Sequence, residues 1–169
     1  MGKELDSHES SHFRSMVGCL QYLTFTRPDI AYGVNLVCQF MHSPTHDHLI
    51  AAKRILRYVK GTIDHGIYLR RGDTLCNSIS HSIHMDAFCD ADWAGDPNDR
   101  KSTTSFVILI DGILVSWCSK KQSSVSRSST EDEYRSMVNT TSEIKWLALL
   151  LQDLHIELKD VPTLHCDNI

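Results

Sequence analysis

The sequence has no long hydrophobic run, and this absence argues against a membrane-spanning helix. None of its apolar stretches approaches the roughly 18 residues that such a helix needs. The first nine residues are mostly polar, so we expect no secretory signal and no membrane partner. Hydrophobic residues make up 41% of the chain and charged residues 22%, a composition that builds a hydrophobic core and not a disordered tail.

The sequence also lacks an excess of positive charge and the cysteine spacing of a zinc finger. Lys and Arg number 17 against 21 Asp and Glu, and the net charge of −4 argues against nucleic-acid binding by bulk charge, although a local basic patch stays open. The six cysteines show no CxxC spacing, so we expect neither a disulfide framework nor a zinc finger. The ten histidines are expected on the surface. Any metal chemistry should therefore come from carboxylates.

Helical periodicity dominates the first third of the chain. Apolar residues recur every three or four positions there, which is the spacing of one helix face. Pro28 and Gly61 are typical of a helix start and a helix end. The predicted helices cover residues 11–23, 29–41 and 46–59, and the apolar trio 67–69 predicts a brief strand.

The polar stretch 70–82 separates this region from a second half with a different pattern. We place a domain boundary there, which divides the chain into residues 1–78 and 79–169. Asp111-Gly112 is a strong hairpin signal between two apolar runs. The expected elements are strands at 83–89, 103–110, 113–117 and 163–166, with a helix at 131–154 before the last strand. This order predicts an α/β fold whose last strand lies beside its first.

Three acidic residues occupy positions where a solvated charge is not expected. Asp90 ends the first predicted strand of the second half, and Asp167 ends the last one. Glu133 lies one turn before Met137 on the apolar stripe of the long helix. If the two strands are neighbours, the three carboxylates converge, and a divalent hard cation is the usual way to offset their repulsion. Mg²⁺ or Mn²⁺ held there can activate water for phosphodiester hydrolysis.

Each acid taken alone has a simpler explanation. An Asp at the end of a strand commonly forms a turn, and a Glu near a helix start commonly interacts with the helix dipole. The combination of the three in this topological order is what indicates a metal site.

The three acids lie within longer motifs. In the second half these are DADWAGD (90–96), DRKST (99–103), VSWCSKKQ (115–122), SRSSTEDEY (126–134) and CDN (166–168). In the first half they are VGCLQYL (17–23), TRPDIAY (26–32) and KRILRYVKGT (53–62). Together, in this order and over nearly the whole chain, they resemble the Pol polyproteins of copia-class LTR retrotransposons.

The resemblance implies a fold and a reaction. Residues 79–169 would form a ribonuclease H-like mixed sheet, and residues 1–78 a helical remnant of the reverse transcriptase thumb or connection region. The implied reaction is hydrolysis of the RNA strand of RNA–DNA hybrids with two Mg²⁺ ions, or Mn²⁺. Asp90, Glu133 and Asp167 would be the catalytic residues and the metal ligands. The rest of a Pol polyprotein is an implied partner.

The family pattern also implies a fourth carboxylate in a segment that follows the CDN motif. Ile169 is the last residue of the sequence, so we expect this domain to be truncated and its cleavage of hybrids to be weak or absent. A module that binds metal or hybrid without turnover is an alternative.

A basic patch in the second half is the expected contact for nucleic acid. Residues 100–135 hold six basic and four acidic side chains, so this segment carries +2 while the whole chain carries −4. Such a patch can follow the phosphates of a hybrid. A solvated loop is the alternative that composition alone favours. The predicted contacts are Arg100, Lys101, Lys120, Lys121 and Arg127.

A different function is suggested by the string Arg54-Ile55-Leu56-Arg57. It matches the RxLR tetrapeptide of secreted effectors of oomycete plant pathogens, which would make the chain a catalytically inactive protein acting in host cells. The same four residues lie in a predicted amphipathic helix and match the copia pattern. A retroelement product would be cytoplasmic or nuclear, whereas an effector would be secreted.

Overall fold

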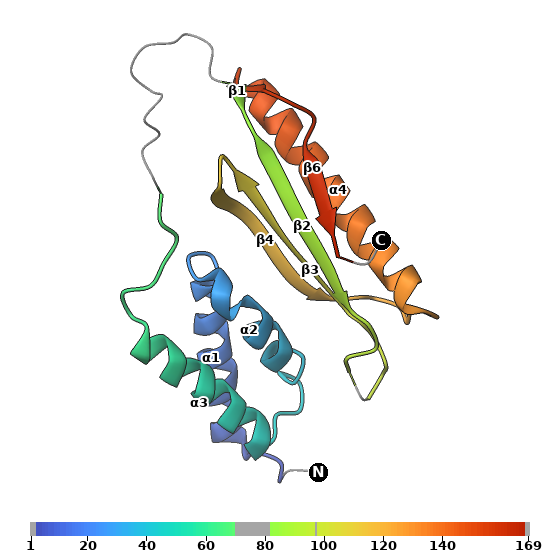
Figure 1. Ribbon diagram of the computed structural model, residues 1–169. Helices are drawn as coiled ribbons and strands as arrows, with labels where there is room; N and C mark the ends of the chain where they lie inside the picture. The colour runs from blue at the N-terminus through green and yellow to red at the C-terminus, as the bar shows by residue number, and fades with distance from the viewer. Residues whose placement is uncertain (1–2, 70–81, 97, 168–169) are drawn as a thin grey trace. The chain divides into compact units, whose positions relative to one another are not determined.

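The computed structural model describes residues 3–69, 82–96 and 98–167 (Figure 1). The chain divides into two compact units, Met1–Ile67 and Tyr68–Ile169. The domain boundary expected between residues 78 and 79 falls in the stretch 70–81, outside the described residues. Among the described helices, none combines the length and the apolar character that crossing a membrane requires.

The first unit consists of helices packed around an apolar core. Its elements are α1 (Ser7–Leu23), the 3₁₀ turn η1 (Pro28–Ile30), α2 (Ala31–Cys38) and α3 (His46–Gly61). A capping box starts α1: the Asp6 carboxylate accepts a hydrogen bond from the backbone N–H of Glu9 over 2.7 Å. Side chains from all three α-helices pack together in the core, among them Phe13, Val17, Val37, Leu49 and Ala52.

Two expectations for this region are wrong. The segment 29–41 is not one helix, because η1 takes its first residues and α2 ends at Cys38. The amides of Phe40 and Met41 bond to carbonyls three residues back, a tighter turn than the α-helix allows. The strand expected at 67–69 does not form: no described strand pairs with it, and Tyr68 and Leu69 are exposed.

The second unit contains a mixed four-stranded sheet and one long helix. Its elements are β1 (Ser82–Ile83), β2 (Met85–Asp92), β3 (Thr103–Ile110), β4 (Ile113–Lys121), α4 (Ser129–Asp153), β5 (Glu157–Leu158) and β6 (Thr163–Cys166). The large sheet has the order β4-β3-β2-β6, with β6 parallel to β2 and the other neighbours antiparallel. β1 and β5 form a small parallel pair. The chain is thus an α/β protein, and its last strand lies beside β2 as predicted.

The hairpin between β3 and β4 forms at the predicted turn. Asp111 and Gly112 both have positive φ, 48° and 76°, which is typical of the type I′ turn that matches the twist of a two-residue hairpin. β4 then continues to Lys121, four residues beyond its expected end.

α4 packs along one face of the sheet (Figure 1). Its cap is Ser128, whose side chain accepts a hydrogen bond from the backbone N–H of Glu131. The core between helix and sheet contains Met85, Ala87, Ile108, Ile144, Leu147 and Leu151. Burying each of the larger side chains contributes roughly 1.5–3 kcal/mol. Leu154, the expected last residue of the helix, is the residue after it and is 60% exposed.

Candidate functional site

Asp90 and Asp167 occupy adjacent positions across the parallel pair of β2 and β6. The register pairs Cys89 with Cys166, so the next residues along the two chains are these two acids. β6 ends at Cys166 and Asp167 follows it directly, as predicted. β2 instead continues to Asp92, two residues beyond Asp90, because β3 pairs with its whole length. The prediction that Asp90 ends a strand is therefore wrong.

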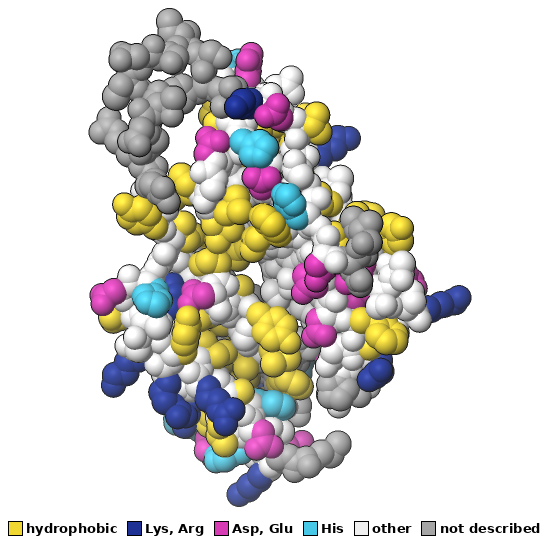
Figure 2. Space-filling model, viewed as in Figure 1, with side chains coloured by type: hydrophobic (Ala, Val, Ile, Leu, Met, Phe, Trp, Pro, Cys, Tyr) yellow, Lys and Arg dark blue, Asp and Glu magenta, His cyan; other side chains and the backbone are white. Residues whose placement is uncertain are grey.

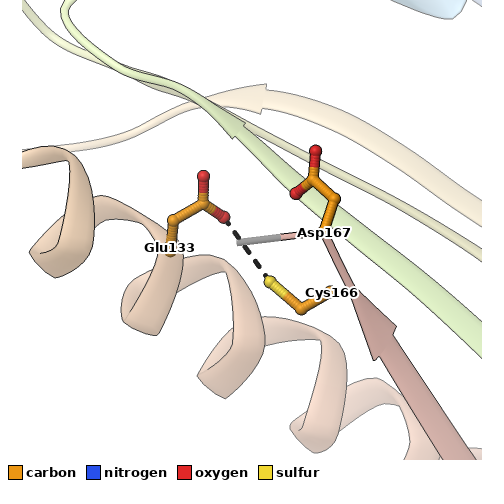
Figure 3. A group of neighbouring side chains, drawn as sticks. All are labelled: Glu133, Cys166 and Asp167. Carbon is orange, nitrogen blue, oxygen red and sulfur yellow. Dashed lines mark hydrogen bonds between the residues drawn. The ribbon is translucent and has the colours of Figure 1, made fainter. Parts of the chain in front are cut away.

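Glu133, Cys166 and Asp167 come together at this end of the sheet (Figure 3). One ligand atom from each lies within 4.8 Å of the other two. The Cys166 thiol donates a hydrogen bond to Glu133 Oε2, with 3.7 Å between sulfur and oxygen. Glu133 is buried, although Asp167 is exposed. A buried carboxylate is costly unless a cation or hydrogen bonds offset the lost hydration, so this group is suited to a cation.

Asp90 lies outside this group of ligand atoms. Side chains of β2 alternate between the buried face, which includes Cys89, and a more exposed face, which includes Asp90. The backbone of Asp90 is nevertheless tied to α4, because its carbonyl accepts a hydrogen bond from Ser136 Oγ over 2.8 Å. Of the three predicted acids, the described structure gathers Glu133 and Asp167 and leaves Asp90 at the next register position.

The two cysteines beside the acids were not expected at the site. Cys89 is buried, and Cys166 pairs with it in register on the neighbouring strand. Burial raises the pKa of the Cys89 thiol to about 11, and Cys166 and Glu133 add to that rise. A signal for them is present in the sequence, since each cysteine directly precedes one of the predicted acids: Cys89 before Asp90, and Cys166 before Asp167.

Glu131 has the structural role that its position at the helix start suggests. Its carboxylate accepts a hydrogen bond from the backbone N–H of Arg127 over 2.8 Å and pairs with Arg135 over 2.6 Å. The hydrogen bond from Arg127, with the charge of Arg135 nearby, holds the pKa of Glu131 below its usual range. Glu131 is thus engaged in holding the start of α4, and Glu133 is the acid that turns toward β6.

A buried polar network holds the loop between β4 and α4. Asp132 is fully buried and accepts hydrogen bonds from the Gln122 amide and from Ser126 Oγ. The Gln122 amide also donates to Thr104 Oγ1 over 3.0 Å. The network joins β3, the loop and α4, and so fixes the first turns of the helix from which Glu133 extends.

The five predicted nucleic-acid contacts do not have the same surroundings. Lys121 is half-buried, binds Asp96 and lies 3.0 Å from Asp99. Its hydrogen bond to Asp96 lowers the pKa of that carboxyl. Lys101 lies 3.8 Å from Asp99, so the loop acids partly neutralise both lysines. The exposed members of the predicted patch are Arg100, Lys120 and Arg127.

Several known proteins are similar in sequence to this chain over most of its length. It is 50% identical over 161 residues to the retrovirus-related Pol polyprotein from transposon RE2 of Arabidopsis thaliana, and 52% identical over 161 residues to that from transposon RE1. These matches cover 95% of this chain. The chain belongs to the Pol polyprotein family of copia-class retrotransposons. It spans about a tenth of the length of those two Pol relatives.

One further relative has a different description. The Pol segment is 40% identical over 138 residues to the secreted RxLR effector protein 161 of Plasmopara viticola, which covers 81% of this chain and 92% of that protein. No family model and no solved structure matches the sequence.

Proposed function

We propose that residues 79–169 of this Pol segment form a ribonuclease H-like domain that hydrolyses the RNA strand of RNA–DNA hybrids with Mg²⁺ or Mn²⁺. The observation that carries this proposal is the convergence of Glu133 and Asp167 at the carboxyl end of the parallel pair β2 and β6. Asp90, at the next register position, is the third proposed ligand, and its carboxylate would have to turn from the exposed face of β2 toward Glu133 and Asp167. Membership of the Pol family supports the assignment, because the motifs of residues 90–168 resemble the ribonuclease H part of such polyproteins.

The donor set fits a hard divalent cation through its carboxylates. Glu133 and Asp167 offer oxygen atoms, which Mg²⁺ and Mn²⁺ prefer, and the exposed Asp167 leaves the site open on one side. The Cys166 thiol is not a Mg²⁺ ligand and would lie beside the ion. When bound, such an ion activates water and stabilises the leaving oxygen of a phosphodiester.

The chain's own residues contribute orientation. Ser136 ties α4 to the backbone of Asp90, and the Asp132 network fixes the loop before the helix, so the Glu133 carboxylate is held at the edge of β6. Arg100, Lys120 and Arg127 are the exposed cations proposed to contact the phosphates of the hybrid. In the longer polyprotein, the remaining Pol regions are the proposed partner that would help to hold the substrate.

Cleavage of an RNA–DNA hybrid with a labelled RNA strand, in Mg²⁺ and in Mn²⁺, tests the proposal. We expect slow cleavage of the RNA strand by the wild-type chain. Asp90→Asn, Glu133→Gln and Asp167→Asn should each reduce it by more than the roughly 10- to 100-fold that loss of an outer-shell partner costs.

Asp153→Asn is the matched control, because Asp153 is exposed at the far end of α4 and its replacement removes the same charge. This variant should cleave like the wild type. Absence of cleavage in both metals, or cleavage that survives all three site substitutions, would overturn the proposal.

A second candidate function, action in a plant host cell, is favoured by the match to the RxLR effector. The RxLR string lies within α3, where Ile55 packs against the helical core and Arg54 and Arg57 are exposed. Figure 2 shows Lys and Arg side chains over this part of the first unit. An amphipathic helix therefore explains the string. A secretion assay in a pathogen and leaf expression test this candidate; secretion or cell death would support it, and neither is expected.

A further inference from the structure

We propose that Glu133, Cys166 and Asp167 form a mixed thiolate and carboxylate site that binds a thiophilic divalent cation such as Zn²⁺. The proposal starts from the kinds of atoms that converge there, one sulfur and two carboxylate groups within 4.8 Å of one another (Figure 3). A purely carboxylate site would favour Mg²⁺, Mn²⁺ or Ca²⁺. The sulfur changes that preference, because soft thiolate ligands select Zn²⁺ over the hard cations.

The spacing of the sulfur and the buried carboxylate already suits one ion between them. A tetrahedral Zn²⁺ with Zn–S near 2.3 Å and Zn–O near 2.1 Å places those two ligand atoms about 3.6 Å apart. Cys166 Sγ and Glu133 Oε2 are 3.7 Å apart, joined by a thiol proton that a metal would replace. Only small side-chain movements are therefore needed for Glu133 and Cys166 to share an ion.

A second thiol, that of Cys89, lies on the strand beside Cys166. Cys89 is the register partner of Cys166 on β2, and the two side chains interact on the face that packs against α4. Cys89 lies outside the group of converging ligand atoms, so it is a neighbour of the proposed coordinating sulfur and not one of the proposed ligands. Asp167, at the exposed side of the group, offers the entry path for the ion.

The site shares Glu133 and Asp167 with the proposed nuclease centre. Zn²⁺ would therefore compete with Mg²⁺ for these carboxylates and inhibit cleavage. This consequence rests on the proposed function, but binding of the thiophilic ion does not.

Titration with Co²⁺, a spectroscopic substitute for Zn²⁺, tests the binding directly. The reduced wild-type chain should develop the near-ultraviolet charge-transfer absorption of a cobalt–thiolate bond, and Zn²⁺ should abolish it. Cys166→Ser should lose the absorption. Cys118→Ser is the matched control and should keep it, because Cys118 is a half-buried cysteine of β4 outside the group.

Asp167→Asn provides a test that does not disturb the core, since the side chain is exposed. We expect it to weaken Co²⁺ binding at least about tenfold, as loss of a ligand should exceed the cost of losing an outer-shell partner. Absence of the absorption in the wild type, or its persistence in Cys166→Ser, would overturn the inference. Neither result bears on Mg²⁺-dependent cleavage, which the assay with the RNA–DNA hybrid measures. A chain that binds Co²⁺ through Cys166 but cleaves no hybrid would overturn only the nuclease proposal.

Discussion

The Ser136 hydroxyl donates a hydrogen bond to the backbone carbonyl of Asp90 over 2.8 Å. Ser136 is fully buried, and this bond joins α4 to β2 beside the candidate site. Apolar contacts, among them those of Met85, Ala87 and Ile144, also hold α4 against the sheet. The hydrogen bond from Ser136 therefore acts together with the Asp132 network to position α4, and with it Glu133, along the strand.

Replacing Ser136 by Ala should destabilise the second unit by about 1 kcal/mol, because the hydrogen bond between its buried hydroxyl and the carbonyl of Asp90 is lost. All three tryptophans, Trp93, Trp117 and Trp146, belong to this unit, so their fluorescence during urea unfolding measures the loss. Ser142→Ala removes a similar hydroxyl from the exposed side of α4, and we expect a change within about 0.5 kcal/mol. Equal effects of the two substitutions would contradict the role given to Ser136.

Phe13 should be the more sensitive of two phenylalanines in the first unit. It is fully buried between the helices, and truncation to Ala should cost about 3–5 kcal/mol through lost contacts and the cavity that remains. Phe25 is 73% exposed, and Phe25→Ala should change stability by less than about 1 kcal/mol. Thermal unfolding followed by the helical circular dichroism signal measures both. A small effect of Phe13→Ala would mean that the core is not packed as described.

The ion pair between Arg27 and Asp29 should make the first unit sensitive to acid. Hydrogen bonding to the Arg27 guanidinium lowers the pKa of Asp29 from 3.8 to about 2. A carboxyl whose pKa is depressed on folding stabilises the folded state above its unfolded value, and that contribution disappears as pH falls through the folded value. The stability difference between wild type and Asp29→Asn should thus be constant above about pH 4 and shrink toward pH 2.

Urea unfolding followed by circular dichroism at several pH values measures this difference. Asp64→Asn is the control, because Asp64 is exposed in the turn after α3 and has no described ion pair. Its stability difference from the wild type should vary less over the same pH range. A difference for Asp29→Asn that stays constant down to pH 2 would contradict the assignment of the ion pair.

Much of the second unit is predictable from local patterns. The turn at Asp111-Gly112 requires two positive φ values, and the apolar runs on either side pair as strands, so the hairpin follows from a few residues. The neighbourhood of β2 and β6 follows from the topological rule for strands joined through a helix. This rule is also why Glu133 and Asp167 could be expected to approach each other.

The parts that sequence reasoning missed depend on contacts between distant segments. Residues 90–92 contain two acids and resemble a turn, but pairing with β3 keeps them extended, and Asp90 is therefore an exposed strand residue. The trio 67–69 has the composition of a strand and lacks a described partner. The only local signal for the thiols of Cys89 and Cys166 is that each precedes a predicted acid, because their proximity exists only once the two strands pair.

The parallel pairing of β2 and β6 also affects the order of events during synthesis. A ribosome makes β2, β3, β4 and α4 first, and this hairpin and helix can fold while β6 is still untranslated. Until β6 docks against β2, Glu133 has neither Cys166 nor Asp167 beside it. A nascent chain without β6 therefore carries no assembled carboxylate pair, and any metal-dependent chemistry at Glu133 and Asp167 starts only after β6 is in place.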